Sequence, residues 1–122
     1  MTAGRVTKLR RAILTAGISL SVLVMTVASA DVLSSEDALA LARKSGCLTC
    51  HKIDTKVIGP AWKDVAAKYK GDPDARAMLQ DKVRKGGKGN WIKVTHGITM
   101  PPTPSRVSDD DIGKLVDFIL SL

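Results

Sequence analysis

Two cysteines and a histidine stand together in the segment Cys47-Leu48-Thr49-Cys50-His51. A cysteine pair at this spacing is typical of four kinds of chemistry: a redox-active dithiol, half of a zinc site, a small disulfide, or the attachment of haem through two thioether bonds. Each of these needs something more from the chain. The surrounding sequence therefore discriminates among them.

The remaining sequence argues against the first three kinds of site. A redox dithiol of the thioredoxin type follows a strand, whereas the residues before Cys47 have a helical pattern. A structural zinc site needs four ligands, and only His96 remains as a further nitrogen or sulfur candidate of the usual kind. A disulfide between Cys47 and Cys50 would close a very small loop and stabilise the fold little.

Covalent attachment of haem c accounts for all three residues. Cys47 and Cys50 add to two vinyl groups of the haem, and His51 meets the iron from one face. A ligating histidine usually donates its other ring N–H to a carbonyl or a carboxylate. The backbone of the nearby Gly59-Pro60 segment, stiffened by its proline, can accept that hydrogen bond. The pattern Cys-x-x-Cys-His therefore predicts one haem c.

The sixth ligand of the iron decides what such a site does, because an open position binds small molecules and a filled one favours electron transfer. Beyond the N-terminal apolar segment, the methionines are Met78 and Met100. Met78 lies on an expected helix, where a core position is the better interpretation. Met100 lies in a loop stiffened by Pro101 and Pro102, so we expect it to be the distal ligand, and a thioether there raises the reduction potential. His96 is the rival ligand, although an exposed loop histidine is its simpler interpretation.

Four helices are expected to position these residues. Their start and stop signals lie at Ser34 and Gly46, at Gly59-Pro60 and Gly71, at Asp72-Pro73 and Gly86-Gly87, and at Ser108 for the last helix. Between the third and last helices lies a segment rich in Gly and Pro, in which Trp-Ile-Lys-Val-Thr is expected to be briefly extended. So long a loop in a small domain indicates a function.

Residues 1–30 have the layout of a secretory signal peptide. Four Lys and Arg precede an apolar stretch, and Ala28-Ser29-Ala30 matches a small-x-small cleavage pattern. We expect cleavage after Ala30 and export to the periplasm. An uncleaved anchor is the alternative, for which the apolar run is short. One domain, residues 31–122, would remain.

The expected mature domain has only a mild positive charge. The first thirty residues hold four of the nineteen Lys and Arg and none of the twelve acids, which leaves +3. No basic run with interleaved aromatics indicates nucleic-acid binding, whereas this charge suits a negatively charged protein partner. With two cysteines and 3% aromatic residues, so small a domain is expected to need something else to fill its core.

Three stretches of the chain resemble the small bacterial class I cytochromes c. They read GCLTCHKIDTKVIGPAWKDVAAKY, TMPP and VSDDDIGKLVDFILSL. The resemblance covers nearly all of residues 31–122. It implies an all-α class I cytochrome c fold, in which four to five short helices surround one covalently attached haem and the first and last helices cross.

The resemblance also implies roles for individual residues. Cys47 and Cys50 carry the haem c, and His51 is the proximal ligand. Pro60 packs against that histidine and offers the backbone acceptor, and Met100 is the distal ligand.

Further positions concern the haem propionates and the methionine loop. Trp91 could fill the core or use its indole N–H as a donor, and the resemblance implies a hydrogen bond to a propionate. Lys82 stands where an arginine often pairs with the propionates, and Thr103 stands where an asparagine is common after Pro-Pro. The segment between Trp91 and the methionine is a few residues longer than usual and contains His96.

We therefore predict an exported, monomeric one-electron carrier of a respiratory chain that catalyses no reaction itself. The resemblance implies redox-protein partners, with a donor such as a quinol–cytochrome c reductase and an acceptor such as nitrite reductase or cytochrome oxidase. A haem edge ringed by lysines such as Lys52, Lys56 and Lys63 would meet them. No nucleic acid is expected to bind, and the membrane is expected to be met only through the signal peptide during export. Two alternatives stay open: a haem enzyme or gas sensor with an open or His96-ligated sixth position, and a thiol–disulfide oxidoreductase.

Overall fold

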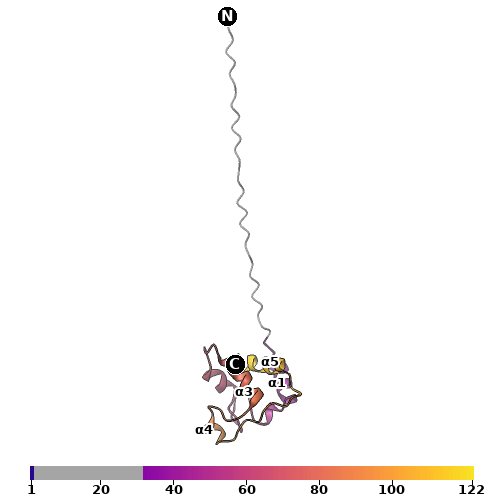
Figure 1. The fold of residues 1–122 in the computed structure, drawn as a ribbon, viewed down its shortest axis with the longest axis vertical. Coiled ribbons are helices and arrows are strands. Elements are labelled where there is room, and N and C mark those ends of the chain that lie inside the picture. Colours follow the sequence, from indigo (N-terminus) through magenta and orange to yellow (C-terminus); the bar gives the residue numbers. More distant parts are fainter. Residues whose placement is uncertain (2–31) are drawn as a thin grey trace.

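The computed structural model of the chain describes Met1 and residues 32–122 (Figure 1). Apart from Met1, the expected signal peptide of residues 1–30 lies outside the described residues, so its cleavage stays a prediction. Within the described part of the chain, no helix combines the length and the apolar character needed to cross a membrane.

Residues 32–122 form five α-helices and one short 3₁₀ helix. The α-helices are α1 (Ser35–Lys44), α2 (Trp62–Lys68), α3 (Ala75–Lys85), α4 (Ile92–Thr95) and α5 (Asp109–Leu120), and the 3₁₀ helix is η1 (Cys47–Thr49). The only β-type pairing among the described residues is an isolated antiparallel bridge between Gly87 and Met100. The prediction of an all-α domain with four to five short helices is confirmed.

The first and last helices begin as their sequences predict. The Ser34 hydroxyl oxygen accepts a hydrogen bond from the Asp37 amide at 3.1 Å, and Ser108 accepts one from the Asp111 amide at the same distance. Each bond satisfies a backbone N–H that has no partner inside the helix. Acidic residues in both first turns add favourable charge at the positive end of each helix dipole.

Two helices begin about two residues later than predicted. The helix α2 begins at Trp62 with Ala61 at its N-cap position, whereas Gly59-Pro60 was expected to start it. The helix α3 begins at Ala75 with Asp74 at its N-cap position, whereas Asp72 was expected there. The Asp72 carboxylate instead accepts a hydrogen bond from the Asp74 amide at 2.9 Å. This local turn competes with the helix for the same backbone groups.

The expected extended segment around Trp91 is also wrong, because residues 92–95 form α4. The amides of Val94 and Thr95 both donate to the carbonyl oxygen of Trp91, at 2.8 and 2.9 Å. His96 then ends the helix in the left-handed conformation, with a φ of 51°. The β-branched residues here close a single helical turn rather than a strand, because no neighbouring strand is present in the described chain to pair with them.

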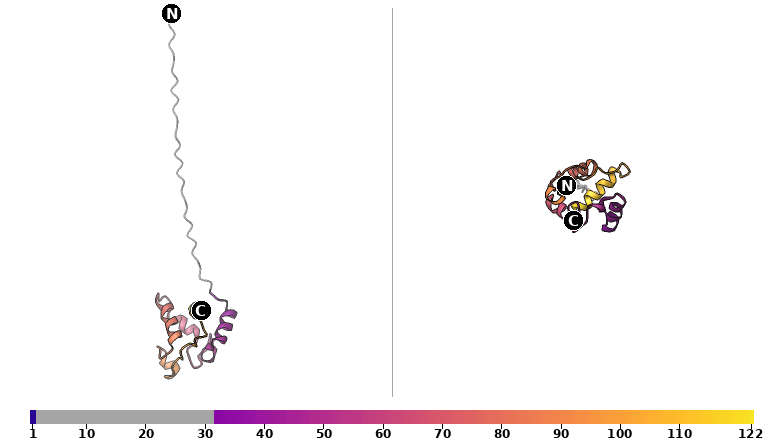
Figure 2. Two further views of the ribbon diagram at one scale, coloured as in Figure 1. Left: turned by 45° about the vertical axis from the view of Figure 1, so that its right-hand side comes forward. Right: turned by 90° about the horizontal axis from the view of Figure 1, so that it is seen from below.

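The C-terminal helix α5 is the centre of the packing. It contacts α1, α2 and α3, and Figure 2 shows it between α1 on one side and residues 75–95 on the other. Ala38 and Ala42 of α1 are fully buried, and their small side chains let α1 approach α5 closely. Trp62 of α2 meets Phe118 of α5 edge to face, with ring centroids 6.3 Å apart, an arrangement that aromatic pairs prefer.

Polar groups join α3 to α5. The Arg76 guanidinium donates two hydrogen bonds to the Asp117 carboxylate, at 2.6 and 2.8 Å. Gly113 of α5 lies close to α3, and a Cβ there would be 2.8 Å from the Gln80 side-chain nitrogen. The two helices are therefore held in one register along their contact.

Candidate haem-binding site

An apolar cavity opens between α3, α5 and the loop segments that flank them. It has about 1160 Å³ of space free of atoms, its open mouth included. Its wall includes Cys47, Cys50, His51 and Met100 together with apolar side chains of both helices. The fold thus brings the predicted attachment and ligand residues to one cavity, although Met100 is far from the others in the sequence.

The cysteine pair lies at a tight turn in the cavity wall. The amides of Cys50 and His51 both donate to the Cys47 carbonyl, at 3.2 and 3.0 Å, so the three side chains leave one turn of backbone. Both cysteines are half-buried free thiols. Burial is the main cause that raises the pKa of the Cys47 thiol, whereas a redox-active thiol needs a lowered pKa.

The ring of His51 is held from several sides. Its Nδ1 lies 2.9 Å from the carbonyl oxygen of Pro60. A carbonyl can only accept, so Nδ1 carries the proton and Nε2 keeps a lone pair for a metal. Trp62 stacks on the ring with centroids 6.2 Å apart, and Gly59 lies so close that a Cβ there would be 2.5 Å from Cε1.

Two of these neighbours, Gly59 and Trp62, were not among the predicted site residues. The Gly-Pro pair indicated a stiff backbone near His51, but nothing local to the sequence indicated that the glycine would touch the imidazole. The spacing of Trp62 on α2 indicated a buried face, which is correct, since its side chain is 3% exposed. Its contact with the histidine depends on how α2 folds back onto the cysteine turn.

Met100 is half-buried in the cavity wall. Its carbonyl accepts a hydrogen bond from the Gly87 amide at 2.7 Å, and its amide donates to the Gly87 carbonyl at 3.3 Å. Met78 does not line the cavity; it lies on α3 with 39% of its surface exposed, so the expectation that it fills the core is wrong. Of these two methionines, Met100 alone is placed to reach a group bound in the cavity.

Trp91 and Lys82 line the cavity, whereas His96 does not. Trp91 is half-buried in the cavity wall, and the Lys68 ammonium lies 5.3 Å from its ring centroid. Lys82 also lines the cavity, and its ammonium donates to the carbonyl of Gly86 at 3.1 Å and to that of Lys88. His96 is exposed and is not among the described residues that form the wall.

The donor set suits haem c better than a metal held by protein side chains alone. In the part of the chain that the structure describes, no three His, Cys, Asp or Glu side chains come together in a way that could hold a metal ion. Haem brings four nitrogen ligands of its own and needs only axial ligands from the protein. An apolar cavity with two thiols, an imidazole whose Nε2 is free and a thioether provides these groups.

The chain is similar in sequence to known proteins. The family model described as Cytochrome c matches residues 35–122. Cytochrome c-551 of Allochromatium vinosum is 50% identical over 84 residues, which are 69% of this chain and 84% of that protein. Cytochrome c-551 of Pseudomonas aeruginosa is 41% identical over 87 residues, which are 71% of this chain and 78% of that protein.

The fold of the chain is similar to solved structures. The crystal structure of wild-type Nitrosomonas europaea cytochrome c552 is similar with a TM-score of 0.62 and 45% identity, over 69% of this chain and 98% of that one. That of the class 1 cytochrome MtoD from Sideroxydans lithotrophicus ES-1 has a TM-score of 0.57 and 34% identity, over 70% and 92% of the two chains. The chain therefore belongs to the cytochrome c family, as a small bacterial class I member. Proteins of this family bind haem c covalently and carry electrons rather than catalyse a reaction, and the predicted fold class and cofactor are confirmed.

Proposed function

We propose that the protein is a periplasmic one-electron carrier whose haem c is attached through Cys47 and Cys50 and ligated by His51 and Met100. It shuttles electrons between respiratory-chain donors and a terminal reductase or oxidase. The observation that carries this proposal is the single apolar cavity whose wall holds both thiols, the imidazole and the thioether.

The haem supplies an iron that changes oxidation state by one electron. The chain's own residues keep the reorganisation energy of that change small. The hydrogen bond from His51 to Pro60 and the backbone bridge from Met100 to Gly87 hold both ligands in place in either oxidation state, so little reorganisation accompanies each electron. The apolar wall excludes water, and a thioether ligand raises the reduction potential.

Replacement of Met100 by Ala in haem-loaded protein tests the ligation. We expect loss of the near-infrared band of the methionine–iron bond and much faster binding of cyanide to the oxidised iron. Met78→Ala is the matched control, because Met78 is exposed on α3 and should leave both readouts unchanged. If Met100→Ala also leaves them unchanged, the sixth position is open or held by His96, and a Met100→Ala, His96→Ala double variant separates these cases.

We propose that the indole N–H of Trp91 donates to a haem propionate. It lies in the cavity wall, and a buried indole N–H normally finds an acceptor. Trp91→Phe keeps the aromatic packing but removes the donor, so it should shift the reduction potential without loss of the methionine–iron band. An unchanged potential would leave Trp91 as wall packing alone.

Docking of an acidic redox partner is supported by the surface next to the cysteine turn. Lys52 and Lys56 are exposed there, and Val57 and Ile58 are exposed apolar neighbours at 50% and 39%. Lys63 contributes less free charge than expected, because its ammonium pairs with Asp54. Transient redox encounters combine this kind of apolar patch with steering by charge.

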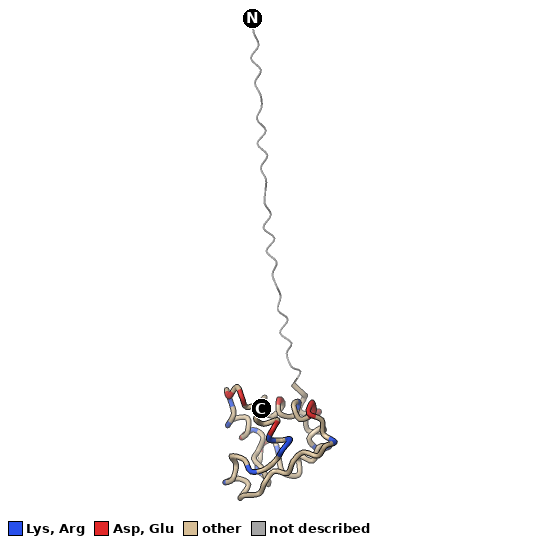
Figure 3. Tube along the Cα trace, in the orientation of Figure 1, with Lys and Arg blue, Asp and Glu red and all other residues tan. Residues whose placement is uncertain are grey.

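A second region with an excess of positively charged residues follows the cysteine turn in the sequence. Residues 82–108 contain six Lys and Arg and no acid, and Figure 3 shows the tube around α4 in blue and tan without red. Both regions suit an electron donor such as a quinol–cytochrome c reductase and an acceptor such as nitrite reductase or cytochrome oxidase, if their docking surfaces are acidic.

Electron-transfer rates test the docking surface. A Lys52→Glu, Lys56→Glu variant should react more slowly with an acidic partner and lose much of its dependence on ionic strength. A Lys44→Glu, Lys70→Glu variant, which makes the same change in net charge at two exposed positions, is the control for net charge alone. Equal effects of the two variants would mean that the partner docks elsewhere.

The periplasmic location is supported by the leader pattern of residues 1–30. Fractionation of cells that express the whole chain should recover haem-loaded protein in the periplasm. N-terminal sequencing of that protein should begin at Asp31. A membrane-bound product that still begins near Met1 would support the uncleaved anchor instead.

A further inference from the structure

The last turn of α3 lies against the segment that carries Met100. Gly86 is buried there with a φ of 66° and a ψ of −145°, a backbone conformation that is close to one adopted almost only by glycine. A Cβ on Gly86 would collide with the carbonyl oxygen of Met100, and it would lie 2.6 Å from both the Pro101 carbonyl carbon and the Pro102 nitrogen. All three contacts are with backbone atoms, which cannot move aside as a flexible side chain can.

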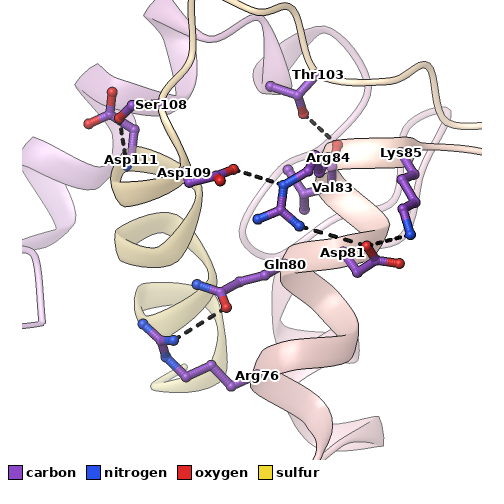
Figure 4. A network of polar contacts seen from close by, with 10 residues as sticks. All are labelled: Arg76, Gln80, Asp81, Val83, Arg84, Lys85, Thr103, Ser108, Asp109 and Asp111. Atoms are coloured by element: carbon purple, nitrogen blue, oxygen red, sulfur yellow. Dashed lines mark hydrogen bonds and ion pairs between the residues drawn. The ribbon is translucent and has the colours of Figure 1, made fainter.

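Hydrogen bonds hold the same two segments together on either side of this contact. Gly87 exchanges two backbone hydrogen bonds with Met100. The Thr103 amide lies 3.3 Å from the carbonyls of both Val83 and Arg84, and the Thr103 hydroxyl donates to Val83 (Figure 4). These carbonyls belong to the end of α3, where helical partners are missing, so the methionine segment takes the place of a C-terminal cap.

The end of α3 is itself firmly placed. Arg84 donates to Asp109 at the start of α5, at 2.8 Å, and Figure 4 shows this bond beside the one from Thr103. About two turns earlier, Arg76 binds Asp117 with two hydrogen bonds. Contacts to α5 thus fix the helix end that the methionine segment caps.

From this arrangement we propose that residues 83–87 are a positioning element for the distal ligand. Gly86, which has no side chain to separate α3 from the Met100 segment, is the residue on which the position of the thioether depends most. The inference rests on the proposed ligation by Met100. It adds that residues at the end of α3, which are not ligands themselves, set the strength of the methionine–iron bond.

Imidazole binding to the oxidised, haem-loaded protein measures this strength. Added imidazole competes with the thioether for the iron, so its apparent dissociation constant falls as the methionine-bound state becomes less favourable. Gly86→Ala should lower that constant about fivefold or more, since displaced backbone at such a site costs about 1–3 kcal/mol and a tenfold change is about 1.4 kcal/mol. The near-infrared methionine band should weaken in parallel.

Gly71→Ala is the control for an alanine placed at a positive φ. Gly71 has a similar φ of 79°, but a Cβ there would meet nothing within 4 Å. This variant should lose stability from strain alone and leave both the imidazole constant and the methionine band unchanged. If Gly86→Ala behaves like Gly71→Ala while Met100→Ala alters both readouts, the positioning role is wrong and the ligation stands. If Met100→Ala alters neither, the ligation is wrong, and the positioning role falls with it.

Thr103 gives a milder test that does not depend on the folding of Gly86→Ala. Thr103→Val removes the hydroxyl that donates to Val83 and should lower the imidazole constant several-fold. Thr103→Ser keeps the hydroxyl and should restore the original value. A Thr103→Val protein with an unchanged constant would overturn the proposal.

Discussion

His51 Nδ1 lies 2.9 Å from the backbone carbonyl oxygen of Pro60, nine residues further along the chain. Because the acceptor is a backbone atom, no side-chain substitution at position 60 removes it. The tautomer of the histidine therefore depends on the path of the 59–61 backbone. That path is held by the Gly59 amide, which donates to the Cys50 carbonyl at 2.8 Å.

Substitution of Gly59 should disturb the histidine more than substitution of Pro60. In Gly59→Ala the new Cβ would lie 2.5 Å from Cε1 of His51, so the ring must turn or the backbone must shift. We expect an altered absorption spectrum of the haem-loaded protein and a loss of about 1–3 kcal/mol in the free energy of unfolding. Pro60→Ala keeps the carbonyl and should change the spectrum less. Equal spectra for Gly59→Ala and the unsubstituted protein would contradict this reading.

Loss of the haem should remove much of the domain's stability. The wall of its cavity combines side chains of α3 and α5 with the cysteine turn, and anything that binds only the folded state stabilises it. A Cys47→Ala, Cys50→Ala variant without haem should unfold at far lower urea concentration and with a broad transition. Circular dichroism measures this. A sharp transition close to that of the haem-loaded protein would show that the polypeptide core suffices.

The aromatic contact between α2 and α5 should be a main contributor to the core. Phe118 is 3% exposed and meets Trp62 edge to face. Phe118→Ala leaves a cavity and should cost about 3–5 kcal/mol in the free energy of unfolding. Phe118→Leu fills most of that space and should cost clearly less. Urea denaturation of both variants decides whether the site has the expected tight packing, and equal losses would contradict it.

The cap of α5 should be worth a smaller amount. Ser108→Ala removes the hydroxyl oxygen that accepts from the Asp111 amide, which should cost about 1 kcal/mol. Ser108→Asp supplies another acceptor and should retain most of the stability. Ser105→Ala, at an exposed loop position, is the control and should change the free energy of unfolding by less than about 0.5 kcal/mol. A Ser108→Ala variant as stable as this control would show that the cap contributes little.

Signals that act over a few residues predict this protein well. The caps of α1 and α5 are correct because a serine side chain reaches an amide only three residues on. The attachment motif is equally local, since one turn of backbone presents Cys47, Cys50 and His51 together. The errors arise where two local signals compete, as at Asp72, or where a β-branched segment has no strand beside it and closes as α4.

The roles of single charged residues were harder to foresee. Lys63 was expected to be free for a partner, yet it pairs with Asp54. Lys82 was expected near a propionate. In the structure its ammonium donates to the backbone carbonyls of Gly86 and Lys88. A long flexible side chain can reach many atoms, so only the folded backbone decides which of them it meets.

The amino-acid sequence by itself determined the cofactor chemistry, the candidate ligands and the order of every α-helix except α4, because each depends on residue types at short, fixed spacings. The tertiary structure decided which of these groups share a cavity and what holds them there. His96 lies outside the wall and Met100 within it, although only three residues separate them. The contacts of Gly86 with Met100 and of Arg76 with Asp117, 41 residues away, join segments distant along the chain. Local sequence patterns do not predict such contacts, because the contacts form only when α3 and α5 pack together and bring the loops between them into place.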